Sequence, residues 1–169
     1  MDRDEDFTAF VAARWGALVR SAVFMGCSVD DARDLVQTAM LRCFKSWGAV
    51  ERADDQDAYV YRVLLNCLRD SRRRRWWGEQ PVGSVPDVQQ AVDEIDRVDT
   101  ADSVFRALGD LSAVNRQVVV LRYYAHLSEQ QTSEVLRIAP GTVKSRLSRA
   151  LNQLEHSPHL AGLRNGSTS

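Results

Sequence analysis

Apolar positions recur every three or four residues along most of the chain, and no convincing segment alternates apolar and polar residues as a β-strand does. The first set predicts an amphipathic helix that stops at Gly26, with the apolar positions Phe7, Phe10, Val11, Trp15, Leu18, Val19 and Ala22. The second set begins after Ser28, which resembles the start of a capping box, and its apolar face comprises Ala32, Leu35, Val36, Ala39, Met40, Cys43, Phe44 and Trp47. Gly48 is placed to end that helix, and the polar residues 49–56 predict a loop. Asp57 is placed to cap a third, long helix over 58–77, whose core face includes Val60, Leu64, Cys67 and Leu68.

Four further helices are predicted in the C-terminal half, over 103–108, 113–124, 128–136 and 140–155. Between the two helical regions the chain is rich in Pro, Gly and Ser and then in acids, which is the composition of a flexible linker. The Ser-, Gly- and Asn-rich end, 156–169, predicts a disordered tail. We therefore expect an all-α protein with a three-helix module at 1–77 and a four-helix module at 103–155, joined by an acidic linker at 78–102.

The charges are distributed unevenly along the chain, so the net charge alone does not describe how the chain interacts with a polyanion. The chain has 169 residues and a formal net charge of −1, which alone argues against a nucleic-acid partner. Residues 78–103 carry 7 acidic and 1 basic side chains, whereas residues 104–169 carry 8 basic and 4 acidic ones, and residues 72–75 are four consecutive arginines. A polyanion responds to charges within a Debye length of about 8–10 Å, so the basic segments can still bind nucleic acid.

The strongest functional signal lies in the last predicted helix. Pro140 suits the first helical position, and one apolar face follows at helical spacing, made of Val143, Leu147, Ala150, Leu151 and Leu154. The opposite face and its flank are polar and basic, with Thr142, Lys144, Ser145, Arg146, Arg149 and Gln153. In a DNA major groove, Arg reaches guanine edges, Ser and Thr reach bases or phosphates, and Lys suits a phosphate. With the preceding helix and the three-residue connection 137–139, this pattern predicts a helix-turn-helix that binds DNA.

A leucine interrupts the polar face of the second predicted helix. Leu41 lies opposite the apolar stripe, surrounded by Asp34, Gln37, Thr38, Arg42 and Lys45. A single exposed leucine is ordinary on a protein surface. An apolar centre with a polar rim is equally the pattern of a small binding site for a partner protein. The residues alone leave both interpretations open.

The third predicted helix ends in the four arginines and then Trp76 and Trp77. Arginines near a helix C-terminus complement the helix dipole, but four in a row exceed that need. Guanidinium groups bind phosphates, and indoles stack on exposed bases. This helix end therefore predicts a nucleic-acid contact, although each tryptophan can instead close the core.

The sequence lacks signatures of enzymes, metal sites and membrane insertion. It contains no Walker loop, GxSxG, HExxH or plausible catalytic triad, and its three cysteines are widely spaced without a CxxC. His156 and His159 flank a proline in the predicted tail, which disfavours a metal site. No apolar run approaches the ~20 residues of a membrane span, and no secretory signal pattern occurs. We expect a cytoplasmic protein that is not an enzyme, with no cofactor, no metal and no direct membrane insertion.

Several segments together resemble extracytoplasmic-function (ECF) RNA polymerase sigma factors. Residues 31–39 (DARDLVQTA) are similar to the helix of that family that binds core polymerase. Residues 58–66 (AYVYRVLLN), running into 72–77, are similar to the promoter-melting and minus-ten helix, and the WWGE ending at 76–79 resembles a short actinobacterial, SigE-like subgroup. Residues 108–111, 122–124 and 141–150 are similar to the fourth region of the family. Order, spacing and length agree over about residues 5–155.

The resemblance implies a promoter-recognition subunit of bacterial RNA polymerase. It implies that core polymerase is bound at its clamp coiled coil by Asp34, Gln37, Thr38, Leu41 and Lys45. It implies that the minus-ten DNA is captured by the third helix and the loop at 50–57, with the candidates Asn66, Arg69, Arg72, Arg73 and Trp76. It implies that the minus-35 DNA is bound by Thr142, Lys144, Ser145, Arg146 and Arg149, while the apolar side of that module contacts the polymerase flap. An anti-sigma factor that clamps both modules is a further partner of the family.

Two residues depart from the family pattern within the helix-turn-helix. Arg137 stands where the turn usually has glycine, and Thr132 stands where the preceding helix usually has an apolar residue. A residue other than glycine forced to φ > 0 costs about 1 kcal/mol or more. We therefore expect a less stable or slightly altered minus-35 module.

Two other functions are alternatives at this point. A stand-alone helix-turn-helix regulator would bind an operator as a dimer, and it would need neither the Leu41 face nor the arginine- and tryptophan-rich helix end. A helical interaction protein that does not bind DNA would be insensitive to the substitutions Arg146→Ala and Arg149→Ala.

Overall fold

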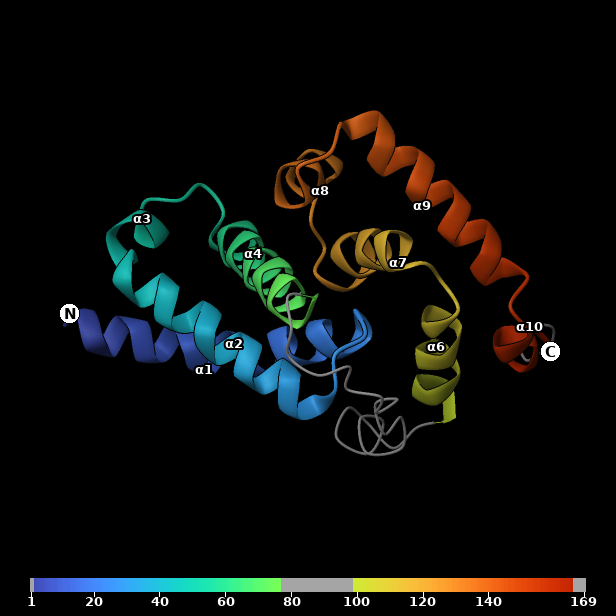
Figure 1. Cartoon of the computed structure of the whole chain (residues 1–169), viewed down its shortest axis with the longest axis horizontal. Coiled ribbons are helices and arrows are strands. Elements are labelled where there is room, and N and C mark those ends of the chain that lie inside the picture. Colours follow the sequence, from blue (N-terminus) through green and yellow to red (C-terminus); the bar gives the residue numbers. More distant parts are fainter. Residues whose placement is uncertain (1, 77–98, 166–169) are drawn as a thin grey trace.

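The computed structural model describes residues 2–76 and 99–165, and within these ranges every regular element is a helix (Figure 1). The N-terminal half contains α1 (Arg3–Phe24), α2 (Val29–Lys45), α3 (Trp47–Glu51) and α4 (Gln56–Trp76). The C-terminal half contains α6 (Asp99–Gly109), α7 (Ala113–Val119), the π-helical turn η1 (Val120–Tyr124), α8 (Glu129–Leu136), α9 (Pro140–Glu155), the 3₁₀ turn η2 (Pro158–Leu160) and α10 (Ala161–Asn165). The all-α prediction is confirmed. Most of the predicted linker lies outside the described residues, and its last part, from Asp99, belongs to α6.

The N-terminal module is a three-helix core in which α2 packs against both α1 and α4. The predicted apolar faces are buried, including Ala32, Val36 and Cys43 of α2 and Val60 and Leu64 of α4. Ser28 caps α2, because its hydroxyl accepts a hydrogen bond from the backbone N–H of Asp31 at 3.1 Å. Gly26 has φ +107° and follows the end of α1, as its position predicts.

Three details of the sequence prediction for this module are wrong. The cap of α4 is Asp55 and not Asp57, because Asp55 Oδ1 accepts the backbone N–H of Ala58 at 3.0 Å and the helix starts at Gln56. The first residues of the expected loop, 49–51, belong to the helix α3, whose Trp47 and Val50 are buried in the core. Helix α2 accordingly ends at Lys45, before Trp47.

The C-terminal module contains the predicted helix-turn-helix, formed by α8 and α9. Helix α8 begins with a complete capping box between Ser128 and Gln131, and α9 begins with Pro140 at its first position. The predicted helix 113–124 is α-helical only to Val119 and continues as the π-helical turn η1. Leu151 was expected on the apolar face of α9 but is 37% exposed, because it lies at the edge of that face.

The segment after α9 is helical where disorder was expected. The turn η2 and helix α10 extend to Asn165, and η2 packs against α6. His159 Nε2 lies 3.1 Å from Asp110 Oδ2, which ties this segment to the end of α6. The prediction of a disordered tail is therefore wrong for residues up to 165, since tertiary contacts order a sequence with weak local preference.

The two modules pack against each other and share one buried cluster. That cluster combines residues of α1, α2 and α4 with Val118, Val120, Leu121, Val135 and Leu136 of the C-terminal half. Helix α8 lies beside α4, and η1 and α6 contact α1 (Figure 1). The structure thus shows a closed arrangement of the two modules.

Polar contacts reinforce that arrangement at the end of α1. Arg116 donates to the backbone carbonyls of Leu108, Gly109 and Leu111 at 2.9–3.2 Å and to that of Met25 at 3.4 Å. Its guanidinium therefore binds carbonyls at the C-terminal ends of two helices, α6 and α1. Nearby, Arg20 Nε donates to the hydroxyl of Tyr124 at 2.7 Å.

One helix within the described residues, α1, has the length and apolar composition of a membrane span. In this structure α1 packs along α2 and buries Phe10, Leu18 and Val23. Its central arginines, Arg14 and Arg20, are both bonded to other elements, Arg14 to Asp57 at 2.7 Å. These contacts are those of a core helix.

Candidate nucleic-acid interface

The recognition helix α9 presents its predicted DNA-facing residues along one side. Lys144, Ser145 and Arg149 are exposed, and Thr142 and Arg146 are partly exposed. The hydroxyl of Ser145 donates to the carbonyl of Thr142 at 3.1 Å, and Lys144 Nζ lies 3.9 Å from Glu129 Oε1 of α8. The structure brings these five residues together on a solvent-facing surface, which a major groove can accommodate.

The turn between α8 and α9 has the geometry expected to be costly. Arg137 adopts φ 58°, ψ 45°, the left-handed conformation that favours glycine, and its N–H donates to the carbonyl of Ser133. His126, after η1, has the same kind of strain at φ 57°. The sequence-based expectation for Arg137 is therefore confirmed at the level of backbone geometry.

Thr132 lies in the interior of the helix-turn-helix. It is 0% exposed, and its Oγ1 has no hydrogen-bond partner among the described residues. A buried hydroxyl without a partner loses its bonds to water and gains none in return. The structure thus places a polar group at a buried position where an apolar side chain would pack, as the sequence predicted.

Among the minus-ten candidates on α4, Asn66 and Arg69 take part in hydrogen bonds, whereas Arg72 and Arg73 are exposed. Arg69 Nη1 donates to Asn66 Oδ1 at 2.8 Å, and Arg69 Nη2 donates to the backbone carbonyl of Val135 in α8 at 3.1 Å. Burial lowers the pKa of Arg69, and the nearby charge of Arg137 adds to this effect. Arg72 and Arg73 are exposed one turn further along, whereas the side chain of Trp76 lies outside the described residues.

The candidate polymerase-binding face of α2 is exposed as a whole. Leu41 has 56% of its surface exposed, and its predicted neighbours Asp34, Gln37, Thr38 and Lys45 are exposed as well. Arg42 was also expected in the rim of Leu41, but that prediction is wrong, because its guanidinium bonds to Asp70 of α4 at 3.0 Å. Helix α2 therefore presents one apolar side chain in a polar rim on a rigid support.

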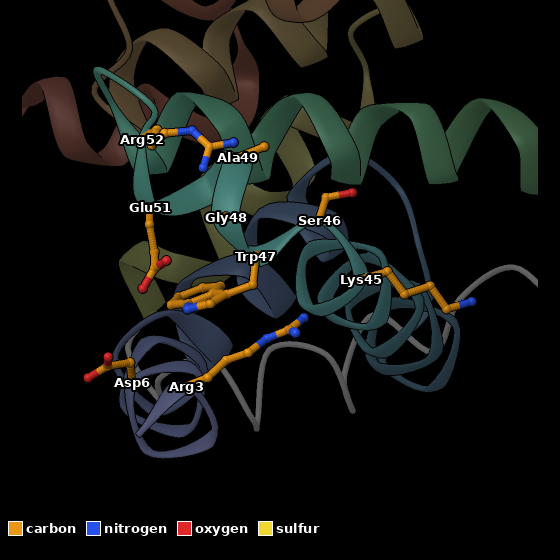
Figure 2. Close-up of a pocket in the computed structure, with 9 residues that line it drawn as sticks. All are labelled: Arg3, Asp6, Lys45, Ser46, Trp47, Gly48, Ala49, Glu51 and Arg52. Atoms are coloured by element: carbon orange, nitrogen blue, oxygen red, sulfur yellow. The ribbon is translucent and has the colours of Figure 1, made fainter. Parts of the chain in front are cut away.

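A pocket of about 620 Å³ opens where the end of this face meets α3 and the start of α1. Figure 2 shows the Trp47 indole between the side chains of Arg3 and Glu51, while Lys45 points away from the indole. Trp47 packs edge-on against Phe7 and Phe10, with ring centroids 5.6 and 5.2 Å apart. The lining mixes cations and carboxylates without a nucleophile paired to a base, so the pocket offers no catalytic arrangement.

Two of the cysteines are placed as core residues and not as reactive groups. Cys43 and Cys67 are buried between α2 and α4. Burial raises the pKa of Cys43 to about 11, so its sulfur is a thiol at neutral pH.

A second, smaller pocket of about 390 Å³ lies between α4 and α8. Asp55 stands at its edge, where its Oδ2 accepts a hydrogen bond from Nε2 of Gln131 at 2.7 Å. The N–H of Ala58, with a contribution from Gln131, holds the pKa of Asp55 below its usual value, so this carboxylate is charged at neutral pH.

Sequence reasoning did not single out Asp55, Gln131 or Arg116. Gln131 lies within the predicted helix 128–136, but its contact with Asp55 crosses 76 residues of sequence. No local pattern predicts a contact of that separation.

Comparison with known proteins covers both modules. Residues 11–78 match the family model for Sigma-70 region 2, and residues 101–154 match the one for Sigma-70, region 4. The chain is 35% identical over 153 residues to the RNA polymerase sigma-E factor of Streptomyces coelicolor, covering 88% of this chain and 84% of that protein. It is 34% identical over 146 residues to the ECF RNA polymerase sigma factor SigL of Mycobacterium tuberculosis, covering 81% and 80%.

Solved structures resemble the chain over most of its length. The sigma factor RpoE of Bartonella quintana, in complex with the anti-sigma factor NepR, superposes with a TM-score of 0.71 at 25% identity, covering 89% of this chain and 95% of that one. CnrH, in complex with the cytosolic domain of CnrY, has the same fold with a TM-score of 0.65. These relatives favour the interpretation that includes both modules over that of a stand-alone regulator.

Proposed function

The chain belongs to the extracytoplasmic-function family of RNA polymerase sigma factors, the subunits that direct core polymerase to promoters, and from this premise we propose which of its residues bind DNA and which bind the polymerase. The observation that carries the proposal is the presence, on one chain, of an exposed apolar-centred face on α2, a basic end on α4 and a basic recognition helix α9. A stand-alone regulator needs only the last of these.

The C-terminal module binds the minus-35 element through α9. Arg146 and Arg149 bind base edges or phosphates of the DNA. Thr142 and Ser145 also bind bases or phosphates, and Lys144 binds the neighbouring DNA backbone. The solvent-facing placement of these side chains on one helix supports this assignment.

The N-terminal module binds the minus-ten element through α4. Arg72 and Arg73 are exposed and suit the phosphates of a separated strand, and Asn66 and Arg69 suit the edges of unstacked bases. Trp76 is the candidate for stacking on a base. Unstacking costs a few kcal/mol per base, which several such contacts together offset.

The α2 face binds core polymerase at its clamp coiled coil. Leu41 supplies the apolar centre, and Asp34, Gln37, Thr38 and Lys45 supply a polar rim. We infer also that the apolar side of the C-terminal module contacts the polymerase flap and that an anti-sigma factor binds the chain, as NepR binds the structural neighbour RpoE. We infer further that the chain acts in the cytoplasm without enzymatic activity.

In vitro transcription tests this proposal. The purified chain and core polymerase are given genomic fragments, and promoter-specific run-off transcripts are expected. The double substitution Arg146→Ala/Arg149→Ala is expected to lower initiation at least about 30-fold while leaving core binding unchanged, since each of the two lost base contacts costs about 1–3 kcal/mol. Arg106→Ala, an exposed arginine of α6 outside the proposed DNA surfaces, is the matched control and is expected to change little. Tight binding to an operator without polymerase, together with no initiation, would overturn the proposal.

A further inference from the structure

Two adjacent pockets join into one groove along the first half of α1. The pocket of about 620 Å³ and a neighbouring pocket of about 360 Å³ share three lining residues, Asp6, Trp47 and Glu51. The larger pocket reaches Arg3 at the start of α1, and the smaller one reaches Arg14. Between these two residues an α-helix rises about 17 Å. The groove is therefore long enough for about five residues of extended peptide.

A buried hydrogen-bond donor without a partner lies where the two pockets meet. Trp47 is 4% exposed, and its Nε1 has no acceptor among the described residues. Figure 2 shows the nitrogen edge of the indole turned towards the side of the groove that Arg3 and Asp6 form. The ring packs edge-on against Phe7 and Phe10, which holds the N–H in this direction. A buried donor without an acceptor is costly, and a ligand that supplies the acceptor removes that cost.

The groove also carries charges of both signs. Asp6 and Glu51 line both pockets, and Lys45 and Arg52 line the larger one. Within the described part of the chain, none of these four side chains takes part in an ion pair or a hydrogen bond. The two carboxylates repel the phosphates of a nucleic acid, whereas a peptide presents carbonyl groups, N–H groups and charged side chains of either sign. The groove therefore fits a peptide better than a nucleic acid.

The groove adjoins the face of α2 that the proposed function assigns to core polymerase. Lys45 is the last residue of α2, belongs to that face and also lines the larger pocket. Arg3, from α1, is fixed in this pocket, because its Nη2 donates to the carbonyl of Phe44 at 2.6 Å and its guanidinium lies over the Phe44 ring. A polymerase segment that lies on Leu41 can thus continue past Lys45 into the groove.

We propose that this groove binds an extended, acidic segment of core polymerase, next to the part that binds Leu41. A backbone carbonyl of the segment accepts the N–H of Trp47. Acidic side chains of the segment are favoured at the larger pocket, where the three cations Arg3, Lys45 and Arg52 outnumber two carboxylates. The inference rests on the proposed function of the α2 face, from which the groove takes its partner.

Two substitutions test in different ways whether the groove is occupied. Ala9→Trp fills it from the exposed surface of α1, since Ala9 lines the smaller pocket. This variant is expected to weaken binding to core polymerase at least tenfold, because the indole takes the place of the bound segment. Thr8→Trp, at an exposed neighbouring position that lines neither pocket, is the matched control and is expected to bind normally. Trp47→Phe keeps an aromatic ring and removes the N–H, so it is expected to weaken binding about two- to tenfold, the loss of one hydrogen bond.

Two measurements are made on the full chain, after circular dichroism has shown that each variant is folded. Surface plasmon resonance reports binding to purified core polymerase in the absence of DNA. Photocrosslinking reports what occupies the groove, with p-benzoylphenylalanine in place of Ala49, an exposed residue that lines the larger pocket. Irradiation of the complex is expected to join this position to a polymerase peptide that contains Asp or Glu, identified by mass spectrometry. The same photoreactive residue in place of Thr8 is expected to give no such product.

Other outcomes would overturn the inference in distinguishable ways. Normal binding of Ala9→Trp, or no crosslink from position 49 to polymerase, means that the groove is empty in the complex. A crosslink from position 49 to DNA in a promoter complex, with none to polymerase, means that the groove binds nucleic acid. Leu41→Glu separates the two proposals. If it loses binding while Ala9→Trp binds normally, only the groove is wrongly assigned, whereas normal binding of Leu41→Glu means that the assignment of the α2 face is itself wrong.

Discussion

Thr132 places a hydroxyl group in the interior of the helix-turn-helix, where its Oγ1 has no partner among the described residues. Leaving a buried hydroxyl unsatisfied costs roughly 1–3 kcal/mol in proteins. Thr132 therefore lowers the free energy of unfolding of the module that contains the recognition helix.

Replacing Thr132 by valine is expected to stabilise the protein by about 1 kcal/mol, because valine has nearly the same shape and no polar group to desolvate. Denaturant unfolding of the full chain measures the change. Thr8→Val, at an exposed position of α1, is the matched control and is expected to stay within about 0.5 kcal/mol of the wild type. No gain in stability for the valine variant at 132 would show that the hydroxyl is satisfied in solution.

Arg137 is the second unfavourable residue of this motif, because its backbone is strained, with φ 58° in the turn before α9. Arg137→Gly is expected to stabilise the chain by about 1 kcal/mol, since glycine adopts this conformation without steric cost. Arg137→Ala removes the same charge but keeps the Cβ atom, so it separates backbone strain from electrostatics. Equal effects of the two substitutions in thermal unfolding would contradict the role of strain.

At the scale of elements, the two faces of α2 have different environments. Its inner face is buried against α1 and α4, and its outer face presents Leu41. Because these faces are separate, a substitution on the outer face changes binding without touching the core.

Leu41→Glu is expected to reduce binding to core polymerase at least tenfold while leaving the unfolding transition unchanged, because a charge replaces the apolar centre of the binding face. Pull-down with core polymerase and circular dichroism measure the two properties. Leu163→Glu, an exposed leucine on α10, is the control and is expected to bind polymerase normally. Unfolding of the variant at 41 would mean that Leu41 belongs to the core.

The ends of a helix could be predicted where neighbouring residues in the sequence determine them, and could not where tertiary contacts do. The helix α9 spans Pro140–Glu155 as expected, because proline at its start and the apolar periodicity that follows are features of the sequence itself. The start of α4 was misplaced because Asp55 and Asp57 are both suitable caps, and only the bond to Ala58 distinguishes them. The five-residue α3 was missed because burial of Trp47 and Val50 stabilises it, and not a periodic pattern.

The candidate site was predictable to the same degree. Exposure of Leu41 and of the α9 residues follows from helical spacing, and the structure bears out that exposure. The engagement of Arg69 by Val135 could not be predicted, because it depends on how the two modules pack against each other, and the two residues are 66 positions apart in the sequence.

At the scale of the whole molecule, Gly26 lies where α1 meets the C-terminal half. A Cβ atom at this position would lie 2.6 Å from Nη1 of Arg116, and the φ of +107° is itself unfavourable for other residues. Gly26 thus permits the approach of Arg116 to the end of α1.

Gly26→Ala is expected to destabilise the chain by about 1–3 kcal/mol, through backbone strain and displacement of the Arg116 guanidinium. Thermal unfolding measures the change. Gly109→Ala has no atom within 4 Å of its new Cβ and is expected to be neutral or slightly stabilising. Equal melting temperatures for the two variants would contradict the close approach at Gly26.

The contact between α4 and α8 joins two helices that are synthesised at different times. At about 5–20 residues per second, the roughly 60 residues from the end of α4 to the end of α8 take about 3–12 s to be made. During that interval α4 can already pack with α1 and α2, while the helix that covers it does not yet exist. A nascent chain is therefore expected to expose the α4 surface proposed to bind minus-ten DNA while it is on the ribosome, and this surface is covered only after α8 has been translated.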